Sequence, residues 1–295
     1  MTYGQAITLD GQRAKLQKCS SEISTAYFLA WANIAWRAWV RLVMAQTAKP
    51  AELRPQTVEA FQAYIDDAEA EMAKTLGSGG SFLWSDATPE IAQRIGTGQI
   101  VAQFWSGGGP IKVPNGLVHD WIAAGLIAGA TVKDVLALIQ NYDNYEDVYK
   151  PEVIASRLIS HQGSDFTIYL RLLKKKVLTV VLDTDHDVHY RCLSRTRWIC
   201  RSYTTRVAEV ENEGTPKERV RAPDTGHGFL WRLYSYWRFE ERGNNVLMEC
   251  RAISLTRDVP LGLGWMLEPI IQKFPRESLV NTLEATRRAL PGGTT

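Results

Sequence analysis

The residues best suited to chemistry in this sequence form one short run, DTDHDVH, between positions 183 and 189. If this run is a strand, alternate residues share a face, so Asp185, Asp187 and His189 lie on one side. His186 then lies on the other side, whereas a turn could gather these side chains around a metal ion. No HExxH motif or other zinc spacing is present, which favours a polar strand end over a ligand set. For a catalytic site, His189 is the best candidate base, because imidazole titrates near neutral pH.

Other catalytic arrangements have little support in the sequence. There is no GxSxG nucleophile elbow, and the glycine runs at 77–80 and 107–109 lack the lysine of a P-loop. Neither a CxxC pair nor a zinc spacing occurs among the cysteines, which are Cys19, Cys192, Cys200 and Cys250. Cys192 and Cys200 flank an expected hairpin turn and could pair after export, although buried free thiols are the simpler interpretation. We therefore predict no metal and no cofactor.

The composition indicates a globular chain with one sizeable core. Of the 295 residues, 45% are hydrophobic, which is enough for a core and an appended segment. The net charge of +2 is small for a nucleic-acid-binding domain, so no nucleic-acid partner is expected. The 10 Trp, 11 Tyr and 8 Phe can line a pocket or fill an ordinary core. The expected partner is an uncharged or amphiphilic small molecule, and no pattern indicates an oligomeric state.

An aromatic run between His227 and Arg242 alternates in character as a strand does. One face carries large apolar residues around a single serine: Phe229, Trp231, Leu233, Ser235, Trp237 and Phe239. The other face carries Arg232, Tyr234, Tyr236, Arg238 and Glu240. The apolar face is expected to form the wall of a core or of a cavity, where Ser235 could orient a ligand.

A tight turn at Gly243 and Asn244 is predicted to join this strand to the next, because both residues tolerate positive φ. Counting outward from a two-residue loop gives the pairs Arg242–Asn245, Arg238–Glu249, Tyr236–Arg251, Trp237–Cys250 and Ser235–Ala252. This register sets opposite charges together on an outer face and large aromatic residues against small ones on an inner face.

The chain closes with a strand, a glycine elbow and a helix between positions 245 and 290. Gly262 and Gly264 interrupt the strand alternation, and Pro275 is expected in the first turn of an amphipathic helix. The apolar stripe of this helix is Leu279, Val280, Leu283 and Leu290. A final helix folded across a sheet is therefore predicted.

The elements before this helix follow a recognisable order. A strand over 116–127, a helix over 131–142, a short helical turn and several strands from 153 onward are predicted. This order, with the phrases GATVKDVLALIQNYDNYEDVYKPEV and RDVPLGLGWMLEPIIQKFPRESL, resembles the START-related superfamily, which includes polyketide cyclases and coenzyme Q-binding proteins. The resemblance covers about 115–290. It implies an α+β helix-grip fold, in which a curved antiparallel sheet wraps around a long C-terminal helix, here with an N-terminal helical extension.

The same resemblance implies a hydrophobic cavity between sheet and helix that binds or transfers a lipid, a quinone or a polyketide-like compound. The residues expected around it are Tyr142, Tyr145, Tyr149, Phe229, Trp231, Leu233, Ser235, Trp237, Ala252, Trp265, Leu279 and Leu283. An enzyme of cyclase or aromatase type is the alternative, with His189 or a tyrosine moving protons in that cavity. A structural interaction module built on the N-terminal extension is a third interpretation. Inward histidines and carboxylates would favour the enzyme, and a uniformly apolar cavity the carrier.

The expected domain organisation is a leading segment, a helical extension, the helix-grip domain and a tail, at 1–45, 46–110, 111–290 and 291–295 respectively. The leading segment is read as an atypical export signal, because relatives with this carboxy-terminal pattern look like exported bacterial proteins. An exported or periplasmic location is therefore favoured over a cytoplasmic one. An amphipathic helix with Trp31, Trp36 and Trp39 at a membrane interface, or a helix packed on the domain, are the alternatives.

Three consecutive lysines, 174–176, separate two strand-like segments. Such a run is expected to lie in a solvated hairpin turn. Transient contact with anionic headgroups at a membrane surface is the alternative.

Overall fold

The structure is a computed structural model that describes residues 50–290 with gaps at 78–79, 106, 176–178 and 259–263, and residues 264–274 by their backbone only. The chain forms two compact units, residues 1–49 and 50–295, and the account below concerns the second. The predictions for the segment 1–45 and for the tail 291–295 lie outside the described residues. Within the described part, no helix has both the length and the apolar character needed to cross a bilayer.

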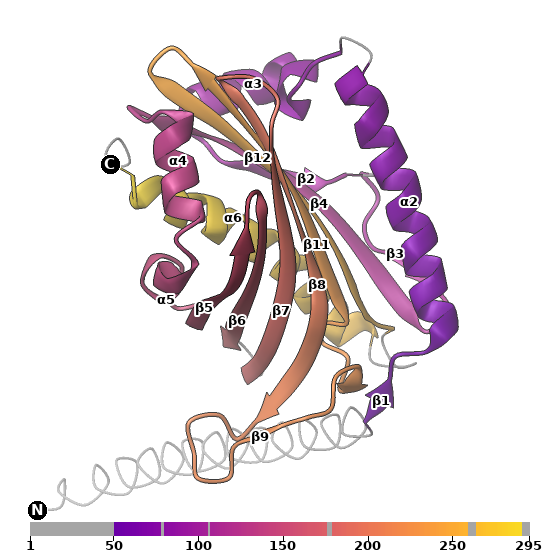
Figure 1. Cartoon of the computed structure of the whole chain (residues 1–295). Helices are drawn as coiled ribbons and strands as arrows, with labels where there is room; N and C mark the ends of the chain where they lie inside the picture. The colour runs from indigo at the N-terminus through magenta and orange to yellow at the C-terminus, as the bar shows by residue number, and fades with distance from the viewer. Residues whose placement is uncertain (1–49, 78–79, 106, 176–178, 259–263, 291–295) are drawn as a thin grey trace, which may run out of the picture. The chain divides into compact units, whose positions relative to one another are not determined.

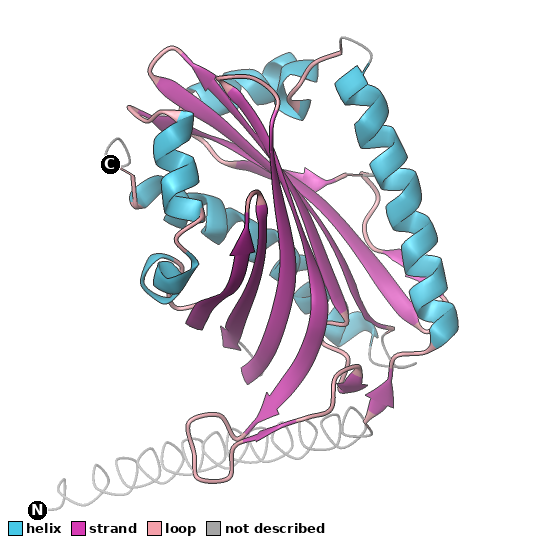
Figure 2. Cartoon of the chain, in the orientation of Figure 1, coloured by secondary structure: helices cyan, strands magenta, loops and turns pink. Residues whose placement is uncertain are grey.

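Figures 1 and 2 show the helices and strands of this unit. The described helices are α2 (Pro55–Gly77), η1 (Trp84–Ala87), α3 (Pro89–Gly96), α4 (Val132–Ile139), η2 (Tyr142–Asn144), α5 (Tyr145–Val148) and α6 (Gly264–Arg288). The described strands are β1 (Ala51–Glu52), β2 (Val101–Phe104), β3 (Ile111–Val113), β4 (Gly116–Ala128), β5 (Val153–Gln162), β6 (Asp165–Lys175), β7 (Thr179–Cys192), β8 (Arg197–Glu211), β9 (Arg219–Val220), β10 (Thr225–Gly226), β11 (Arg232–Arg242) and β12 (Asn245–Arg257).

One large antiparallel sheet organises the unit. Its strand order is β2-β4-β12-β11-β8-β7-β6-β5, with β3 added along β4 and β9 along β8, while β1 pairs with β10 separately. The long strands curve together on one side of α6 (Figure 1). We call the side of the sheet that faces α6 the concave face. The side that faces α2 is the convex face. A curved antiparallel sheet around a C-terminal helix is the α+β helix-grip arrangement, so the predicted fold class is confirmed.

The hairpin β11–β12 has the register that the sequence predicts. All five pairs counted from the turn are present, and Gly243 has a φ of 60° at that turn. Side chains alternate across a strand, so this register also decides which residues of both strands face α6.

Helix ends agree less closely with the sequence. Thr131 caps α4 as expected: its hydroxyl accepts from the Asp134 backbone N–H, and the Asp134 carboxylate accepts from the Thr131 N–H. The closing helix begins at Gly264. Pro275 therefore lies inside α6, and the expectation that it occupies the first turn was wrong, because the residues before it already follow helical geometry.

The sheet has a hydrophobic core on each face. On the concave face, the largest cluster joins β4, β6, β7, β8, β11 and β12 to α4 and α6, and it includes Phe239, Met248, Leu279 and Leu283. On the convex face, Phe61, Ile65 and Ala68 of α2 pack with Val118, Ile253 and Leu255 of the sheet. The apolar side of α2 is thus buried against the sheet.

Charged side chains seal α2 and η1 onto the convex face. The Arg251 guanidinium donates to the Asp120 carboxylate at 2.7 Å and to Glu71 of α2 at 3.1 Å. Tyr64 of α2 donates to the same Asp120 at 2.7 Å. The Glu249 carboxylate accepts from the backbone N–H groups of η1, at Trp84 and Ser85, at 2.8 and 2.7 Å.

Residues 50–110 therefore belong with the sheet. Besides the contacts of α2, the strand β2 pairs directly with β4. The compact unit that contains the sheet begins at residue 50.

Candidate functional site

A row of mostly small side chains crosses the middle of the concave face. Cross-strand pairing aligns Trp121 on β4, Ala252 on β12, Ser235 on β11 and Ser202 on β8, and we call these four residues the serine row. Trp121 is buried. The other three are only partly buried, although their strands lie well inside the sheet.

The helices leave the serine row incompletely covered. α6 packs mainly on β4, β2 and β12, and α4 packs on α6 and β11. The connection between α5 and β5 also meets α6: the hydroxyls of Tyr149 and Thr286 lie 3.0 Å apart, and Asn281 donates to Glu152 at 2.8 Å. The β11 and β8 part of the row therefore lies on strands between these two contacts with α6.

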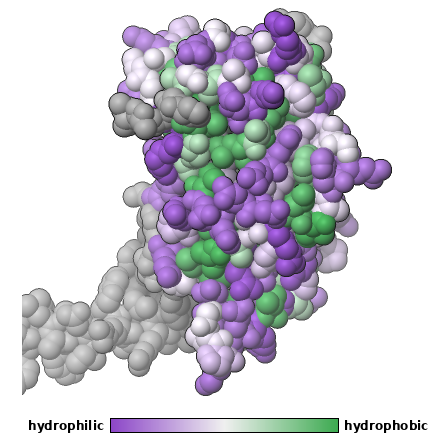
Figure 3. Space-filling model, turned by 60° about the vertical axis from the view of Figure 1, so that its left-hand side comes forward, coloured by the Kyte–Doolittle hydropathy of each residue, from purple (hydrophilic) through white to green (hydrophobic). Residues whose placement is uncertain are grey.

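The outer surface on the α4–α5 side of the molecule is not one continuous apolar patch. Figure 3 brings the α4–α5 side of the molecule forward and shows apolar residues in several small patches separated by hydrophilic ones.

His186 is the polar centre of the concave face. Thr184 donates its hydroxyl to the Leu170 carbonyl at 3.0 Å, so it accepts from His186 Nε2, which lies 2.9 Å away. This assignment leaves Nδ1 as an acceptor for the Ser202 hydroxyl at 3.3 Å. Burial lowers the pKa of His186 to about 4, so the imidazole is neutral at pH 7.

Two further polar groups on this face have no hydrogen-bond partner. Trp121 Nε1 and His119 Nδ1 are both buried and unpaired. The other ring nitrogen of His119, Nε2, lies 2.9 Å from the Thr256 hydroxyl. Burial lowers the pKa of His119 to about 4, so this ring is also uncharged near neutral pH.

The three tyrosines expected around the cavity are largely buried. Tyr142 and Tyr149 are buried, and Tyr145 is partly buried. The Tyr142 hydroxyl lies 2.7 Å from that of Tyr190, and Tyr145 donates to the Ile139 carbonyl at 2.5 Å. Burial raises the pKa of all three phenols. Tyr142 and Tyr145 belong with the concave cluster, and the Tyr149 hydroxyl reaches Thr286 of α6.

The acidic run at 183–189 alternates as a strand should. Asp185, Asp187 and His189 lie on the convex face and His186 on the concave face, as predicted for a strand. His189 Nδ1 pairs with Asp165 at 2.7 Å, and 37% of its side chain is exposed. His189 therefore cannot act as a base on the concave face. His186 has that position, and the alternation itself was the signal that could have identified it.

Four of the predicted aromatic and apolar positions have different outcomes. Leu233 and Trp237 lie on the concave face with Ser235 and Ala252. Trp231 instead packs with Phe61 of α2, and Phe229 is exposed and stacks with His227 at 5.4 Å. Their predicted places in the wall were wrong, because β11 begins only at Arg232 and the alternation does not extend further back.

On the helix side of the predicted site, α6 contributes two residues with described side chains. Leu279 and Leu283 are buried in the concave cluster. The side chain of Trp265 lies outside the described part of the chain. For the positions that do lie on the concave face, contact with a ligand stays a prediction.

The described side chains include no arrangement suited to metal binding or thiol chemistry. No group of three or more His, Cys, Asp or Glu there could hold a metal ion. Cys200 and Cys250 are buried free thiols, whereas Cys192 is free but exposed. Burial raises the pKa of Cys200 to about 12, which keeps it protonated.

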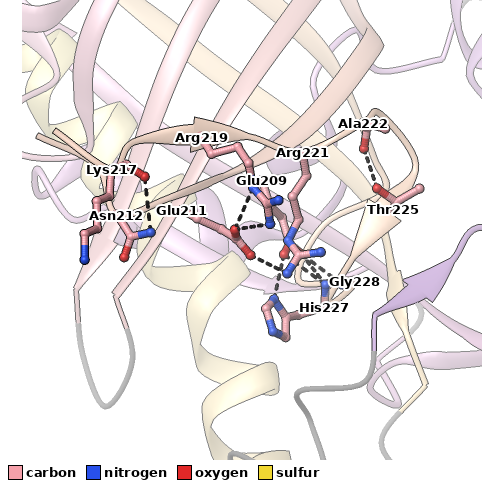
Figure 4. A network of polar contacts seen from close by, with 10 residues as sticks. All are labelled: Glu209, Glu211, Asn212, Lys217, Arg219, Arg221, Ala222, Thr225, His227 and Gly228. Carbon is pink, nitrogen blue, oxygen red and sulfur yellow. Dashed lines mark hydrogen bonds and ion pairs between the residues drawn. The ribbon is translucent and has the colours of Figure 1, made fainter. Parts of the chain in front are cut away.

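The segment between β8 and β11 is held by one carboxylate (Figure 4). Glu209 accepts from the backbone N–H groups of His227 and Gly228 at 2.8 and 3.0 Å, and from His227 Nδ1 at 2.7 Å. Burial alone would raise its pKa, but these hydrogen bonds lower it. Gly226 has a φ of 136°, and a Cβ there would lie 2.5 Å from this carboxylate. We call this contact the Glu209 clasp.

The strand order and the gripped helix α6 define an α+β helix-grip fold, as the resemblance implied. The chain is similar to a STAR-related lipid transfer protein from Xanthomonas axonopodis, with 16% identity, a TM-score of 0.40, and 61% of this chain and 96% of that chain covered. It is also similar to human STARD10, with 11% identity, a TM-score of 0.39, and coverage of 72% and 84%.

A third similar structure is the Zhui aromatase/cyclase from Streptomyces sp. R1128, with 12% identity, a TM-score of 0.37, and coverage of 60% of this chain and 99% of that chain. No protein-family model and no curated protein sequence matches the chain.

Proposed function

We propose that residues 50–290 bind a hydrophobic small molecule between the concave face and α6, and that they hold it away from water. The serine row carries this proposal, because Ala252, Ser235 and Ser202 stay partly exposed inside the sheet. In the next row on the same face of these strands, Cys250 and Cys200 are buried and Trp237 between them is partly buried. A tightly filled core would bury the small side chains of both rows alike.

The chemistry of the concave face suits an apolar ligand. Leu233, Trp237 and Ala252 offer apolar surface, and the hydroxyls and imidazoles near them are uncharged at pH 7. Burying apolar ligand surface stabilises a complex by about 25 cal/mol per Å², so roughly 200 Å² contributes about 5 kcal/mol. Binding therefore needs no charged headgroup site on this face.

Sequestration or transfer fits this face better than catalysis. A general base works best with a pKa near the working pH, whereas both concave imidazoles have a pKa of about 4. His189 lies on the opposite face, where it pairs with Asp165. An interaction module built on the N-terminal extension is also disfavoured, because the apolar side of α2 is already used against the sheet.

The proposal is tested by filling the serine row. Ser235→Trp adds a large ring at the centre of the row, and Arg201→Trp adds the same ring at an exposed position on the adjacent strand β8 and on the opposite face. Binding of the neutral dye Nile red is measured by fluorescence titration for both variants and the wild type. We expect Ser235→Trp to weaken binding about tenfold, a loss of about 1.4 kcal/mol, and Arg201→Trp to leave it within about twofold.

Native mass spectrometry of the purified protein, followed by organic extraction, gives an independent measurement of bound molecules. Recovery of one lipid class supports the carrier. Equal Nile red affinity in the wild type and Ser235→Trp, or no dye binding at all, overturns the proposed site.

A further inference from the structure

We infer that the bound molecule carries an uncharged hydroxyl group, which donates a hydrogen bond to Ser202 Oγ on β8 and accepts one from Ser235 Oγ on β11. The inference rests on the proposed function and names the chemical class of its ligand, an apolar alcohol or phenol. Ser202 has no signal in the sequence, and its role follows from the side chains behind it.

The first support is a chain of hydrogen bonds whose direction is fixed at its inner end. Thr184 donates its hydroxyl to the Leu170 carbonyl at 3.0 Å, so it accepts from His186 Nε2 at 2.9 Å. A neutral imidazole has one donor and one acceptor nitrogen. Nδ1 of His186 therefore accepts from the Ser202 hydroxyl at 3.3 Å. The proton of Ser202 is thus used toward the sheet, and its oxygen can only accept a further hydrogen bond.

The second support is the hydroxyl on the opposite strand. Ser235 pairs directly with Ser202 across β11 and β8, and both residues are partly exposed. No hydrogen bond joins the Ser235 side chain to another described residue, Ser202 included, so its hydroxyl is able to donate. Unpaired polar atoms that are closed off from solvent occur elsewhere in the described part of the chain, and the Ser235 oxygen is not one of them.

The third support is that one atom can serve both serines. Directly opposite residues of an antiparallel pair have Cβ atoms about 4.5–5.5 Å apart. Two hydrogen bonds of about 2.8 Å to one shared oxygen span up to about 5.6 Å. Since Ser202 offers an acceptor and Ser235 a donor, the shared oxygen has to donate one hydrogen bond and accept the other. A hydroxyl does both, whereas a carbonyl or an ether oxygen only accepts and satisfies Ser235 alone.

The fourth support is the absence of charge around the pair. Its described neighbours on the concave face are uncharged at pH 7, and they are Val188, Cys200, Thr204, Leu233, Trp237 and Ala252. Arg201 and Arg238 of the same strands point to the convex face, where Arg201 lies over the Tyr203 ring and Arg238 donates to the Phe82 carbonyl. A carboxylate or an ammonium group would find no counter-charge beside the two serines.

The test uses probes of similar size that differ in hydrogen bonding. 1-Decanol donates and accepts, its isomer 1-methoxynonane only accepts, undecane does neither, and decanoate adds a negative charge. Displacement of Nile red by each probe is measured by fluorescence titration for the wild type, Ser202→Ala, Ser235→Ala and Ser160→Ala. Each probe is compared between proteins rather than with the other probes, because this comparison cancels the different affinities of the probes for water.

The two serine variants should affect different probes. Ser202→Ala removes the acceptor, so it should weaken binding of 1-decanol about tenfold and leave 1-methoxynonane and undecane within about twofold. Ser235→Ala removes the donor, so it should weaken both the alcohol and the ether about tenfold and leave undecane within about twofold. A general loss of packing would instead weaken all three probes alike.

Ser160→Ala is the matched control. It removes the same hydroxyl from an exposed position of the edge strand β5, opposite Thr167. It should leave the affinity for every probe within about twofold of the wild type. In the wild type itself, decanoate should bind more weakly than 1-decanol.

Three results overturn the inference and leave the proposed function standing: equal losses of alcohol and ether affinity in Ser202→Ala, no loss of alcohol affinity in either serine variant, or tighter binding of decanoate than of 1-decanol. If one serine variant does not fold, the other still decides the question, because each predicts its own pattern of losses. If neither Nile red nor undecane binds the wild type, the proposed function itself is overturned.

Discussion

The two faces of the sheet are made by the same strands but satisfy their polar groups in opposite ways. On the convex face, Arg251 and Asp120 are both buried and paired with each other and with α2. On the concave face, the polar groups are neutral, and two of them on β4 have no partner. The convex face can bury charged side chains, because the helix α2 that covers it supplies their partners. The concave face, where we propose that a ligand binds, carries neutral polar groups instead.

The largest expected effect lies in the part of the concave face that α6 does cover. Leu283 is fully buried against β4, close to Gly125. Leu283→Asp removes its apolar contacts and buries a charge, so we expect a loss of about 5 kcal/mol or more in the free energy of unfolding. Urea denaturation measures this loss. An unchanged midpoint would show that α6 does not hold the concave face.

Removing one charge from the convex face should lower the free energy of unfolding nearly as much. Arg251→Met leaves the Asp120 carboxylate buried with only the Tyr64 hydroxyl of its former partners, and we expect a loss of about 3–5 kcal/mol. Replacing both residues, Arg251→Met with Asp120→Leu, should recover much of this stability. If the double variant is less stable than the single one, the pair itself stabilises the fold, and the contrast between the faces is weaker than described.

A smaller effect is expected from pH, and it belongs to the concave face. His186 has a pKa of about 4 in the folded state and about 6.5 when unfolded, so the unfolded chain binds more protons between these values. Stability from this group is present above pH 6.5 and is lost as pH falls toward 4. Each pKa unit corresponds to about 1.4 kcal/mol, so the loss should amount to a few kcal/mol.

The variant His186→Gln separates this contribution from that of the carboxylates, which also bind protons as the pH falls. Its free energy of unfolding should fall less steeply than that of the wild type between pH 6.5 and 4, as followed by urea denaturation at each pH. Parallel curves for the two proteins would mean that His186 is protonated without penalty and that its surroundings are wetter than described.

The smallest effect is expected from removing the leading segment. Residues 50–295 form a compact unit of their own, with cores on both faces of the sheet. Deletion of residues 1–45 should therefore leave cooperative unfolding and the melting temperature nearly unchanged, as measured by circular dichroism. Loss of the cooperative transition would mean that one of the two faces depends on that segment.

Much of the fold could be predicted from local rules, because a strand alternates and a turn fixes its register. The Gly243 turn correctly paired Trp237 with Cys250 and Ser235 with Ala252. The same reasoning failed at Trp231, where the strand ends and the backbone turns the ring toward α2. Alternation holds only inside a strand, and sequence gives strand ends least reliably.

The candidate site was less accessible to prediction, since it depends on which side chains find partners. Glu249 and Arg251 were expected on an outer face opposite Arg238 and Tyr236. Their register is confirmed, but both are buried, because η1 and α2 cover them. The unpaired atoms of His119 and Trp121 follow from long-range packing, and no local spacing in the sequence indicates them.

The Glu209 clasp also makes the protein a convenient host for engineering. Glu209 binds His227, which lies 18 positions later in the chain. The two ends of the loop between them are therefore held together, whatever the length of the loop. Added chain at the exposed tip, near Glu213, increases only the entropy of a loop that is already closed, by about 0.6 kcal/mol for each doubling of length. A reporter domain inserted there would inherit a fixed attachment point beside the sheet, without redesign of its strands.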